Sequence, residues 1–134
     1  MKINYSCDLN ELDGLDMSGF FVGWPKPPSI EVLRKILCGS YSVVLAIEGK
    51  KLVGFVNSIS DGVLSAYIPL LEVLPEYQKM GIGKELVIRL NQKLSAFYMV
   101  DLLCDANLIS YYEKLGMTKT QGAYLRNYER QSGE

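Results

Sequence analysis

Residues 70–104 contain a strand, a glycine-containing turn, a patterned helix and a second strand, in that order. Leu70–Val73 is a short apolar run, and Leu74-Pro75 breaks it. From Gly81 to about Leu94, apolar side chains recur at the spacing of one helix face, namely Ile82, Leu86, Val87, Leu90 and Leu94. Met99–Cys104 is again short and apolar. Such a unit joins parallel neighbours through a right-handed crossover, so the sequence predicts an α/β fold.

Three strands precede this crossover and predict an antiparallel meander. They are expected over 43–47, 51–59 and about 63–73, with turns at Glu48-Gly49-Lys50 and Asp61-Gly62. Pro69 lies inside the third strand, where it removes a ladder hydrogen bond and indicates a bulge or a departure from a neighbouring strand. The predicted sheet is therefore mixed and mostly antiparallel, with one parallel pair.

The two ends of the chain complete one predicted domain over residues 1–134. Near the N-terminus, three prolines keep the aromatic stretch 19–28 out of a helix, and Ser29 is placed to cap a helix that Gly39 ends. Near the C-terminus, we expect a helix over Leu108–Leu115, ended by Gly116, and then a strand region over Met117–Tyr128.

The composition excludes several classes of partner. A formal net charge of −1 provides no long-range positive field, so neither nucleic acid nor an anionic membrane is expected as a partner. The N-terminus has no apolar targeting segment, and no stretch approaches the ~20 apolar residues that span a bilayer. Three cysteines without a histidine fit neither a disulfide framework nor a zinc site. We expect a cytoplasmic protein without a metal, either a monomer or a homodimer.

The turn Gln78-Lys79-Met80-Gly81-Ile82-Gly83 has the properties of an anion site. The first backbone N–H groups of a helix have no internal partner, and the helix dipole adds about 0.3–1 kcal/mol for an anion. Two glycines allow a ligand to approach that backbone, and Lys79 and Lys84 add positive charge. A phosphate or pyrophosphate is the expected guest. The alternative is that the glycines only shape a tight turn.

Two common phosphate-binding motifs do not match this turn. A Walker A loop requires glycine in place of Gln78 and serine or threonine in place of Glu85, and the dinucleotide fingerprint requires glycine or alanine in place of Leu86. The segment 74–86 instead resembles the acetyl-CoA-binding segment of GNAT acetyltransferases. The family pattern is Arg or Gln, then Gly three residues later, then Gly or Ala two residues after that, and Gln78, Gly81 and Gly83 match it in full. The segment 107–117 is similar to a second family segment ending in Tyr-Glu-Lys-Leu-Gly-Phe, with methionine as its last residue.

The resemblance covers residues 42–128 and implies a GNAT-like fold with acetyl-CoA as acyl donor. It implies that the strand near 66–73 splays from its parallel neighbour near 99–104, leaving a cleft for the pantetheine arm of the donor. Asn107 matches a family position that bonds this arm, although asparagine at a helix start is also a common cap. The positions expected to hold the donor are Leu71, Val73, Gln78, Lys79, Met80, Gly81, Ile82, Gly83, Lys84 and Asn107.

Acetyl transfer to an amine requires a neutral nucleophile and a proton for the departing thiolate, and the chain has no histidine. Tyr112 matches the family tyrosine that approaches the CoA sulfur and is the candidate general acid, although its helical spacing also fits a core position. Glu72 is the candidate base, because burial on the cofactor strand would raise its pKa; the alternative is a solvent-facing strand residue. Cys104 is interpreted as a small buried hydrophobe rather than an acyl-carrying nucleophile.

The function predicted from these features is N-acetylation of a primary amine, on a small molecule or a peptide, by direct transfer from acetyl-CoA. The resemblance implies that the N-terminal part builds the acceptor pocket, where the aromatic loop with Phe20, Phe21 and Trp24 either lines the pocket or covers the core. The alternative function is a non-catalytic acyl-CoA-binding or regulatory module that keeps the cofactor turn. A purely structural domain is the third possibility.

Overall fold

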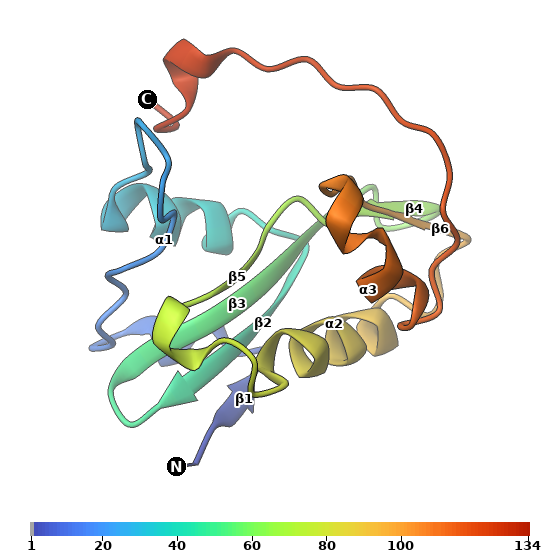
Figure 1. The fold of residues 1–134 in the computed structure, drawn as a ribbon. Coiled ribbons are helices and arrows are strands. Elements are labelled where there is room, and N and C mark those ends of the chain that lie inside the picture. Colours follow the sequence, from blue (N-terminus) through green and yellow to red (C-terminus); the bar gives the residue numbers. More distant parts are fainter. Residues whose placement is uncertain (1) are drawn as a thin grey trace.

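The computed structural model describes residues 2–134 as a mixed sheet with helices on both faces (Figure 1). The sheet order is β1-β2-β3-β4-β6, and β5 pairs with β3. The strands are β1 Asn4–Ser6, β2 Ser42–Glu48, β3 Lys51–Ser60, β4 Ser65–Tyr67, β5 Leu71–Val73 and β6 Met99–Asp101. The helices are α1 Ile30–Cys38, α2 Ile82–Lys93 and α3 Ile109–Glu113, with short 3-10 turns η1 Leu9–Leu12, η2 Pro75–Tyr77, η3 Ala106–Leu108 and η4 Tyr128–Arg130. The predicted α/β class with a mixed sheet is confirmed.

The central strands β2 and β3 are buried on both faces, which is why they read as continuous apolar runs. Alternate side chains of β2 belong to two different clusters. Val44 and Ala46 pack with the buried face of α2, and Val43 and Leu45 pack with α1 and the N-terminal segment. The antiparallel pairing of β2 with β3 agrees with the predicted hairpin. The pairing of β1 with β2 was not predicted, because β1 is a three-residue strand without a clear pattern.

The third predicted strand, 63–73, is wrong as a single element. It consists of two short strands, β4 and β5, which pair with different parts of β3 and are separated at Pro69. Asn57 of β3 stabilises the break, since its Oδ1 accepts the N–H of Leu70 at 3.1 Å and its own N–H donates to the Leu70 carbonyl at 3.2 Å. The departure that Pro69 indicated is therefore present.

The parallel pair is formed by β4 and β6, and the chain passes between them through β5 and α2. The strand predicted at Leu70–Val73 as the parallel neighbour of β6 is β5, which pairs with β3 instead. The last hydrogen bond between the two chain segments joins the Ile68 N–H to the Asp101 carbonyl, at 2.9 Å. Beyond this point β5 follows β3, so the parallel segments separate, as expected for a splayed pair. β6 ends at Asp101, earlier than the predicted Cys104. None of the helices among residues 2–134 has the length and apolar character needed to cross a bilayer.

α1 begins and ends where the sequence predicts. Ser29 Oγ accepts the N–H of Val32 at 3.2 Å, and Gly39 follows the last helical residue. The helix covers the sheet face opposite α2, because Leu33 and Leu37 are buried among the side chains of β2 and β3. The N-terminal segment passes over the same face (Figure 1).

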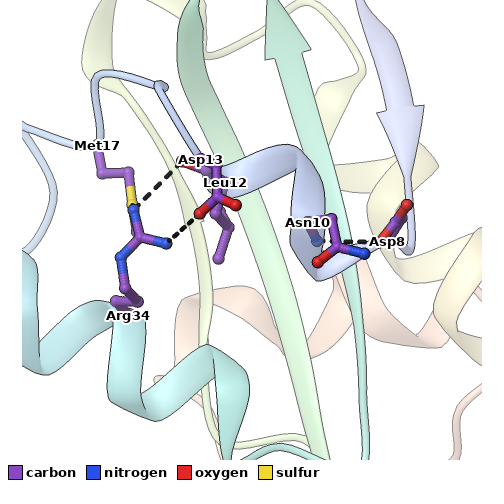
Figure 2. A network of polar contacts seen from close by, with 6 residues as sticks. All are labelled: Asp8, Asn10, Leu12, Asp13, Met17 and Arg34. Carbon is purple, nitrogen blue, oxygen red and sulfur yellow. Dashed lines mark hydrogen bonds and ion pairs between the residues drawn. The ribbon is translucent and has the colours of Figure 1, made fainter.

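The N-terminal segment is fixed to α1 through Arg34 (Figure 2). The guanidinium lies 3.3 Å from the Asp13 carboxylate and 3.3 Å from the Leu12 carbonyl, and it also contacts the Met17 sulfur at 3.8 Å. Asp8 caps the short turn η1 just before these residues. The loop that follows Met17 therefore starts from a fixed point.

The predicted C-terminal strand over Met117–Tyr128 is absent from the structure. α3 is preceded by η3 and is shorter than the predicted helix, although Gly116 ends this region with φ 95° as expected. Residues 117–127 then run as an extended segment without strand pairing, and the only regular element after it is η4. Figure 1 shows this segment as an orange-to-red arc that leaves the body of the fold and returns near α1.

Candidate active site

The turn before α2 presents backbone donors to the outside. Gly81 caps the helix with φ 83°, and the first helical hydrogen bond runs from the Glu85 N–H to the Gly81 carbonyl, at 3.1 Å. The N–H groups of the three intervening residues, Ile82, Gly83 and Lys84, therefore have no partner within the helix. A Cβ at Gly81 would meet nothing within 4 Å, so the backbone here is open to a ligand. The geometry is that of a helix N-terminal anion site.

Two side-chain hydrogen bonds fix this turn against the sheet. Gln78 Nε2 donates to the Val73 carbonyl at 3.0 Å, and the Tyr77 hydroxyl donates to Glu48 Oε1 at 2.5 Å. The Glu48 carboxylate is the main reason why the pKa of Tyr77 is raised. The amide of Gln78 is thus used to hold the turn onto β5. A ligand at this turn would meet the exposed Lys79, which has φ 64°, rather than a free glutamine amide.

The edge of β5 opposite β3 carries unpaired backbone groups. The Leu74 N–H donates to Val53, and Leu70 pairs with Asn57, so residues 70 and 74 face β3. Because neighbouring residues of a strand alternate, the backbone groups of Leu71 and Val73 point to the other side. The Val73 carbonyl there already accepts from Gln78. The N–H groups of both residues and the Leu71 carbonyl are placed to pair with an extended amide-containing chain such as pantetheine.

Glu72 lies on β5 between these two residues, and it is half-buried. Its Oε1 accepts the backbone N–H of Phe21 at 3.0 Å. Burial raises the pKa of the Glu72 carboxyl above its usual range, and the hydrogen bond from Phe21 opposes part of that rise. Glu72 is therefore neither the solvent-facing residue of the alternative interpretation nor a fully buried one.

Tyr112 on α3 lines the same cleft as Glu72. Burial is the main cause that raises the pKa of Tyr112 to about 12, with further contributions from Tyr111 and Cys104. The rings of Tyr111 and Tyr112 meet edge to face, 5.1 Å apart. Burial also raises the pKa of the Cys104 thiol, which disfavours the thiolate that a nucleophilic role requires.

The cleft opens where β5 separates from β6. Its volume is about 1610 Å³, and its walls come from β5, from β6 and the segment after it, from α3 and from the C-terminal segment. A smaller pocket of about 370 Å³ is also lined by Glu72, between β5, Gln78 and the loop residues Gly19, Phe20 and Val22. Glu72 thus lines both a space beside the N-terminal loop and the larger cleft that contains Tyr112.

Most of the remaining positions predicted to hold the donor are exposed, and one is buried in the core. Met80, Lys79 and Lys84 are exposed around the turn, while Ile82 is buried in the core and contributes its backbone alone. Asn107 is exposed within η3 and does not cap a helix, since Asp105 and Leu108 occupy the two cap positions. Among residues 2–134 no group of three potential metal ligands occurs.

Two residues near the site were not singled out by the sequence. A Cβ at Gly83 would lie 3.2 Å from the Tyr111 hydroxyl, so Tyr111 reaches the start of α2 and is more than a packing partner. Asn57 bonds Leu70 at the break between β4 and β5. The sequence feature that could have indicated this role is an asparagine within an otherwise apolar strand. In the aromatic loop, Phe21 is buried and packs on Phe55, so it mainly covers the core.

Comparison with known proteins identifies the family of this chain. The model of the acetyltransferase (GNAT) family matches residues 9–117. A crystal structure from Deinococcus radiodurans R1, assigned as an acetyltransferase, is 41% identical and superposes with a TM-score of 0.91, covering 97% of this chain and 92% of that one. The uncharacterised N-acetyltransferase ycf52 of Pyropia yezoensis is 32% identical over 89% of this chain and 70% of its own length.

A more distant structural neighbour shares the fold and was solved with a bound donor analogue. AAC(6')-Iy, solved with a bisubstrate analogue that contains CoA, is 16% identical and has a TM-score of 0.65, covering 95% of this chain and 98% of that one. The helix N-terminus at Gly81, the split between β5 and β6 and the family match lead to one conclusion. The chain belongs to the GNAT family of N-acetyltransferases, enzymes that use acetyl-CoA as the acyl donor.

Proposed function

We propose that this enzyme transfers the acetyl group of acetyl-CoA directly to a primary amine on a small molecule or a peptide, with Glu72 as base and Tyr112 as acid. The observation that supports this assignment is the shared cleft: both side chains line the space that opens where β5 leaves β6. A carboxylate and a phenol in one cleft provide the two opposite proton transfers that the reaction needs.

The donor would bind along two elements that meet at the turn. Its pyrophosphate would accept hydrogen bonds from the N–H groups at the start of α2, assisted by the exposed Lys79 and Lys84. Its pantetheine arm would pair with the free edge of β5 at Leu71 and Val73, as an added strand. This path brings the thioester to the part of the cleft that Tyr112 lines.

The reaction consists of one bond formed, one bond broken and two proton transfers. The neutral amine attacks the thioester carbonyl, and the tetrahedral intermediate then expels the CoA thiolate. Glu72 accepts the proton that the amine nitrogen loses, directly or through water, which its raised pKa favours at neutral pH. Tyr112 donates its phenol proton to the departing sulfur, and solvent later restores both groups.

The pKa of Tyr112 sets the energetic demand on this last step. With its pKa raised to about 12, the Tyr112 phenol gives up its proton less readily than an unperturbed tyrosine, for which transfer to an ordinary thiolate is uphill by about 2 kcal/mol. The same burial that raises the phenol pKa also raises the pKa of a thiol bound beside it, and this reduces the difference. Because its pKa is raised, Tyr112 keeps its proton at neutral pH and is therefore available as a proton donor and not as a base.

The acceptor would enter from the side of the N-terminal loop. Phe20 and Val22 line the smaller pocket beside Glu72, and Trp24 lines the larger cleft. The carboxylate of Glu72 attracts a protonated amine, because an opposite charge nearby favours the charged form, and it is also the group placed to accept a proton from that amine. A primary amine attached to an apolar or aromatic body fits these surroundings better than an acidic acceptor does.

An amine-library screen that follows the release of free CoA thiol tests this proposal. We expect turnover with at least one class of primary amine, and a large loss of turnover in Tyr112→Phe and in Glu72→Gln. Binding of the donor is measured separately: acetyl-CoA at about one hundred times its Kd should stabilise the fold by ~2.7 kcal/mol and raise Tm by about 10 °C. Stabilisation without turnover on any amine would favour the alternative, a non-catalytic acyl-CoA-binding module.

A further inference from the structure

The tip of the β2–β3 hairpin contacts the turn before α2 from outside the cleft. Glu48 is the last residue of β2 and pairs with Lys51 across the hairpin turn. Its carboxylate accepts the hydroxyl of Tyr77, a residue of η2, at 2.5 Å. Within residues 2–134, the walls of the cleft and of the smaller pocket include neither Glu48 nor Tyr77. Any effect of this pair on the reaction must therefore act through another part of the molecule.

The Tyr77 side chain is held in two ways. Its ring is half-buried against the core cluster that contains Leu74 and Ile82. Its hydroxyl donates to a charged acceptor, and hydrogen bonds to ionised groups are about twice as strong as those between neutral groups. The same carboxylate raises the pKa of Tyr77, so the phenol keeps the proton that it donates. Tyr77 is thus a fixed point directly before the turn.

The residues that follow Tyr77 need such a fixed point. The Gln78 N–H donates back into η2 at 3.3 Å, and the next backbone N–H that donates to the backbone, within residues 2–134, is that of Glu85 at the start of α2. Between them, Lys79 has φ 64° and Gly81 has φ 83°. A left-handed backbone is unfavourable for lysine and persists only where its surroundings determine it. The open turn therefore depends on the contacts that hold its two ends.

The conformation of the turn determines where its donors point. The three N–H groups at the start of α2 are the expected ligands of the pyrophosphate, and their direction depends on the path of the chain through Lys79 and Gly81. If the first end of the turn were free, Lys79 could return to an ordinary backbone conformation. The donor would then have to order the turn as it binds, and such ordering lowers affinity.

A second contact of the hairpin tip holds the N-terminal segment. The Asp16 N–H donates to the Lys50 carbonyl at 2.8 Å, and the Asp16 carboxylate accepts from the Lys51 ammonium at 3.1 Å. Asp16 belongs to the segment that leads into the aromatic loop. The same hairpin tip therefore contacts the donor turn through Glu48 and the N-terminal segment through Asp16, and the two side-chain contacts can be removed separately.

We propose that Tyr77 and Glu48 are positioning residues for the acyl donor, because their hydrogen bond holds the turn 78–81 in the open form that receives the pyrophosphate. The pair acts through the turn and touches neither substrate. Its loss lowers the affinity for acetyl-CoA and leaves the chemical step intact, since Glu72 and Tyr112 belong to other elements, β5 and α3. This role of the pair rests on the proposed binding of the pyrophosphate at the start of α2.

Calorimetric titration of acetyl-CoA, together with steady-state kinetics on an accepted amine, tests this role. Tyr77→Phe keeps the ring against the core and removes only the hydroxyl, so the variant should fold. We expect the Kd and the KM of acetyl-CoA to rise about fivefold to tenfold, with kcat at saturating donor within about twofold of wild type. Glu48→Ala should give the same increase, whereas Glu48→Gln should keep most of the affinity, because its amide oxygen still accepts the hydroxyl.

Asp16→Ala is the matched control, because it removes a side-chain contact of the same hairpin tip and should leave the Kd of acetyl-CoA unchanged. The double variant Tyr77→Phe, Glu48→Ala should bind no more weakly than either single variant, since each change removes the same hydrogen bond. An unchanged Kd in Tyr77→Phe would overturn the proposal, and a lower Tm in that variant would then give the pair a purely structural role. An equal loss of affinity in Asp16→Ala would overturn it as well.

Gly83→Val separates a failure of this role from a failure of the proposed donor site. If Gly83→Val abolishes the binding of acetyl-CoA while Tyr77→Phe binds normally, the pyrophosphate uses the turn and the pair does not position it. If both variants fold and bind normally, the donor lies elsewhere, and the positioning role is overturned together with the donor site. Weakened binding in both variants, with kcat preserved in Tyr77→Phe alone, is the result expected.

Discussion

The carboxylate of Glu72 accepts the backbone N–H of Phe21 at 3.0 Å and so joins the middle of β5 to the N-terminal aromatic loop. Phe21 has φ 60°, a value that non-glycine residues seldom adopt, and its ring is buried against Phe55. One oxygen of Glu72 thus helps to hold the loop in this conformation. The same carboxyl group is the candidate base, so one side chain both holds the N-terminal loop and is placed to accept the proton of the amine.

Glu72→Gln is expected to keep the loop in place and to abolish the base. The glutamine carbonyl can still accept the Phe21 N–H, whereas an amide cannot take a proton from the amine. Turnover should fall by roughly 100-fold or more, while the affinity for acetyl-CoA changes little. Glu72→Ala removes both functions and should in addition lower Tm, so comparison of the two variants separates catalysis from loop support. Wild-type turnover in Glu72→Gln would remove Glu72 from the mechanism.

The raised pKa of Glu72 also predicts a pH dependence. A carboxyl whose pKa is higher in the folded state binds its proton more tightly when folded, so its contribution to stability is greatest at low pH and is lost as the pH rises through the folded pKa. The difference in Tm between wild type and Glu72→Gln should therefore shift in favour of wild type as the pH is lowered from about 8 to about 4. In kcat/KM, the loss of the base on acidification should begin above the ordinary range for glutamate. An opposite trend in the Tm difference would contradict the raised pKa.

Tyr112→Phe is expected to lower kcat by roughly 100-fold and to leave the Kd of acetyl-CoA nearly unchanged, since the ring stays and only the proton donor is lost. Tyr111→Phe is the matched control on the neighbouring residue. Its hydroxyl lies near Gly83, so its loss should affect donor binding more than kcat. Stopped-flow or steady-state kinetics with an accepted amine would measure both effects. Equal losses of kcat in the two variants would argue against a specific role for the Tyr112 hydroxyl.

Gly83→Val is expected to block acetyl-CoA at the start of α2. The added branches would lie beside the Tyr111 hydroxyl, 3.2 Å from the new Cβ, and would extend over the backbone where the pyrophosphate approaches. Calorimetric titration should show at least a tenfold weaker Kd. Gln92→Val places valine at an exposed position near the other end of α2 and serves as the control for helix propensity. A folded Gly83→Val protein with normal affinity would show that the pyrophosphate binds elsewhere.

Local sequence signals determined α1, α2 and the turn before α2 well. Ser29 caps α1 as predicted, and the apolar face that starts at Ile82 is buried as predicted, because each depends on residues close in sequence. The link between Glu72 and Phe21 joins residues far apart in the chain, so no pattern contains it. The C-terminal strand could not be placed from propensity, because a strand also needs a free edge within reach, and Gln131 and Gly133 contact the opposite layer. The predicted strand over Met117–Tyr128 is therefore wrong.

The split between β4 and β5 depends on Asn57, and its removal should weaken both the fold and the donor site. The side chain is 1% exposed; its Oδ1 accepts the Leu70 N–H, and its Nδ2 donates to Ser40 Oγ at 3.0 Å. Asn57→Ala leaves both partners inside the protein without these bonds, which should cost about 2–4 kcal/mol and lower Tm by about 10 °C. Thermal unfolding followed by circular dichroism measures this loss.

Donor binding distinguishes this role of Asn57 from general support of the core. If the Leu70 N–H must be held for β5 to leave β4, Asn57→Ala should also raise the KM for acetyl-CoA several-fold at a temperature where the variant is folded. Ser58→Ala is the control, because Ser58 is the next residue on β3 and is equally buried. Its hydroxyl forms a hydrogen bond with the Ser42 hydroxyl at 2.6 Å and not with the segment between β4 and β5. It should lose about 1 kcal/mol of stability and keep the wild-type KM. Equal KM values in both variants would mean that Pro69 alone is sufficient to open the cleft.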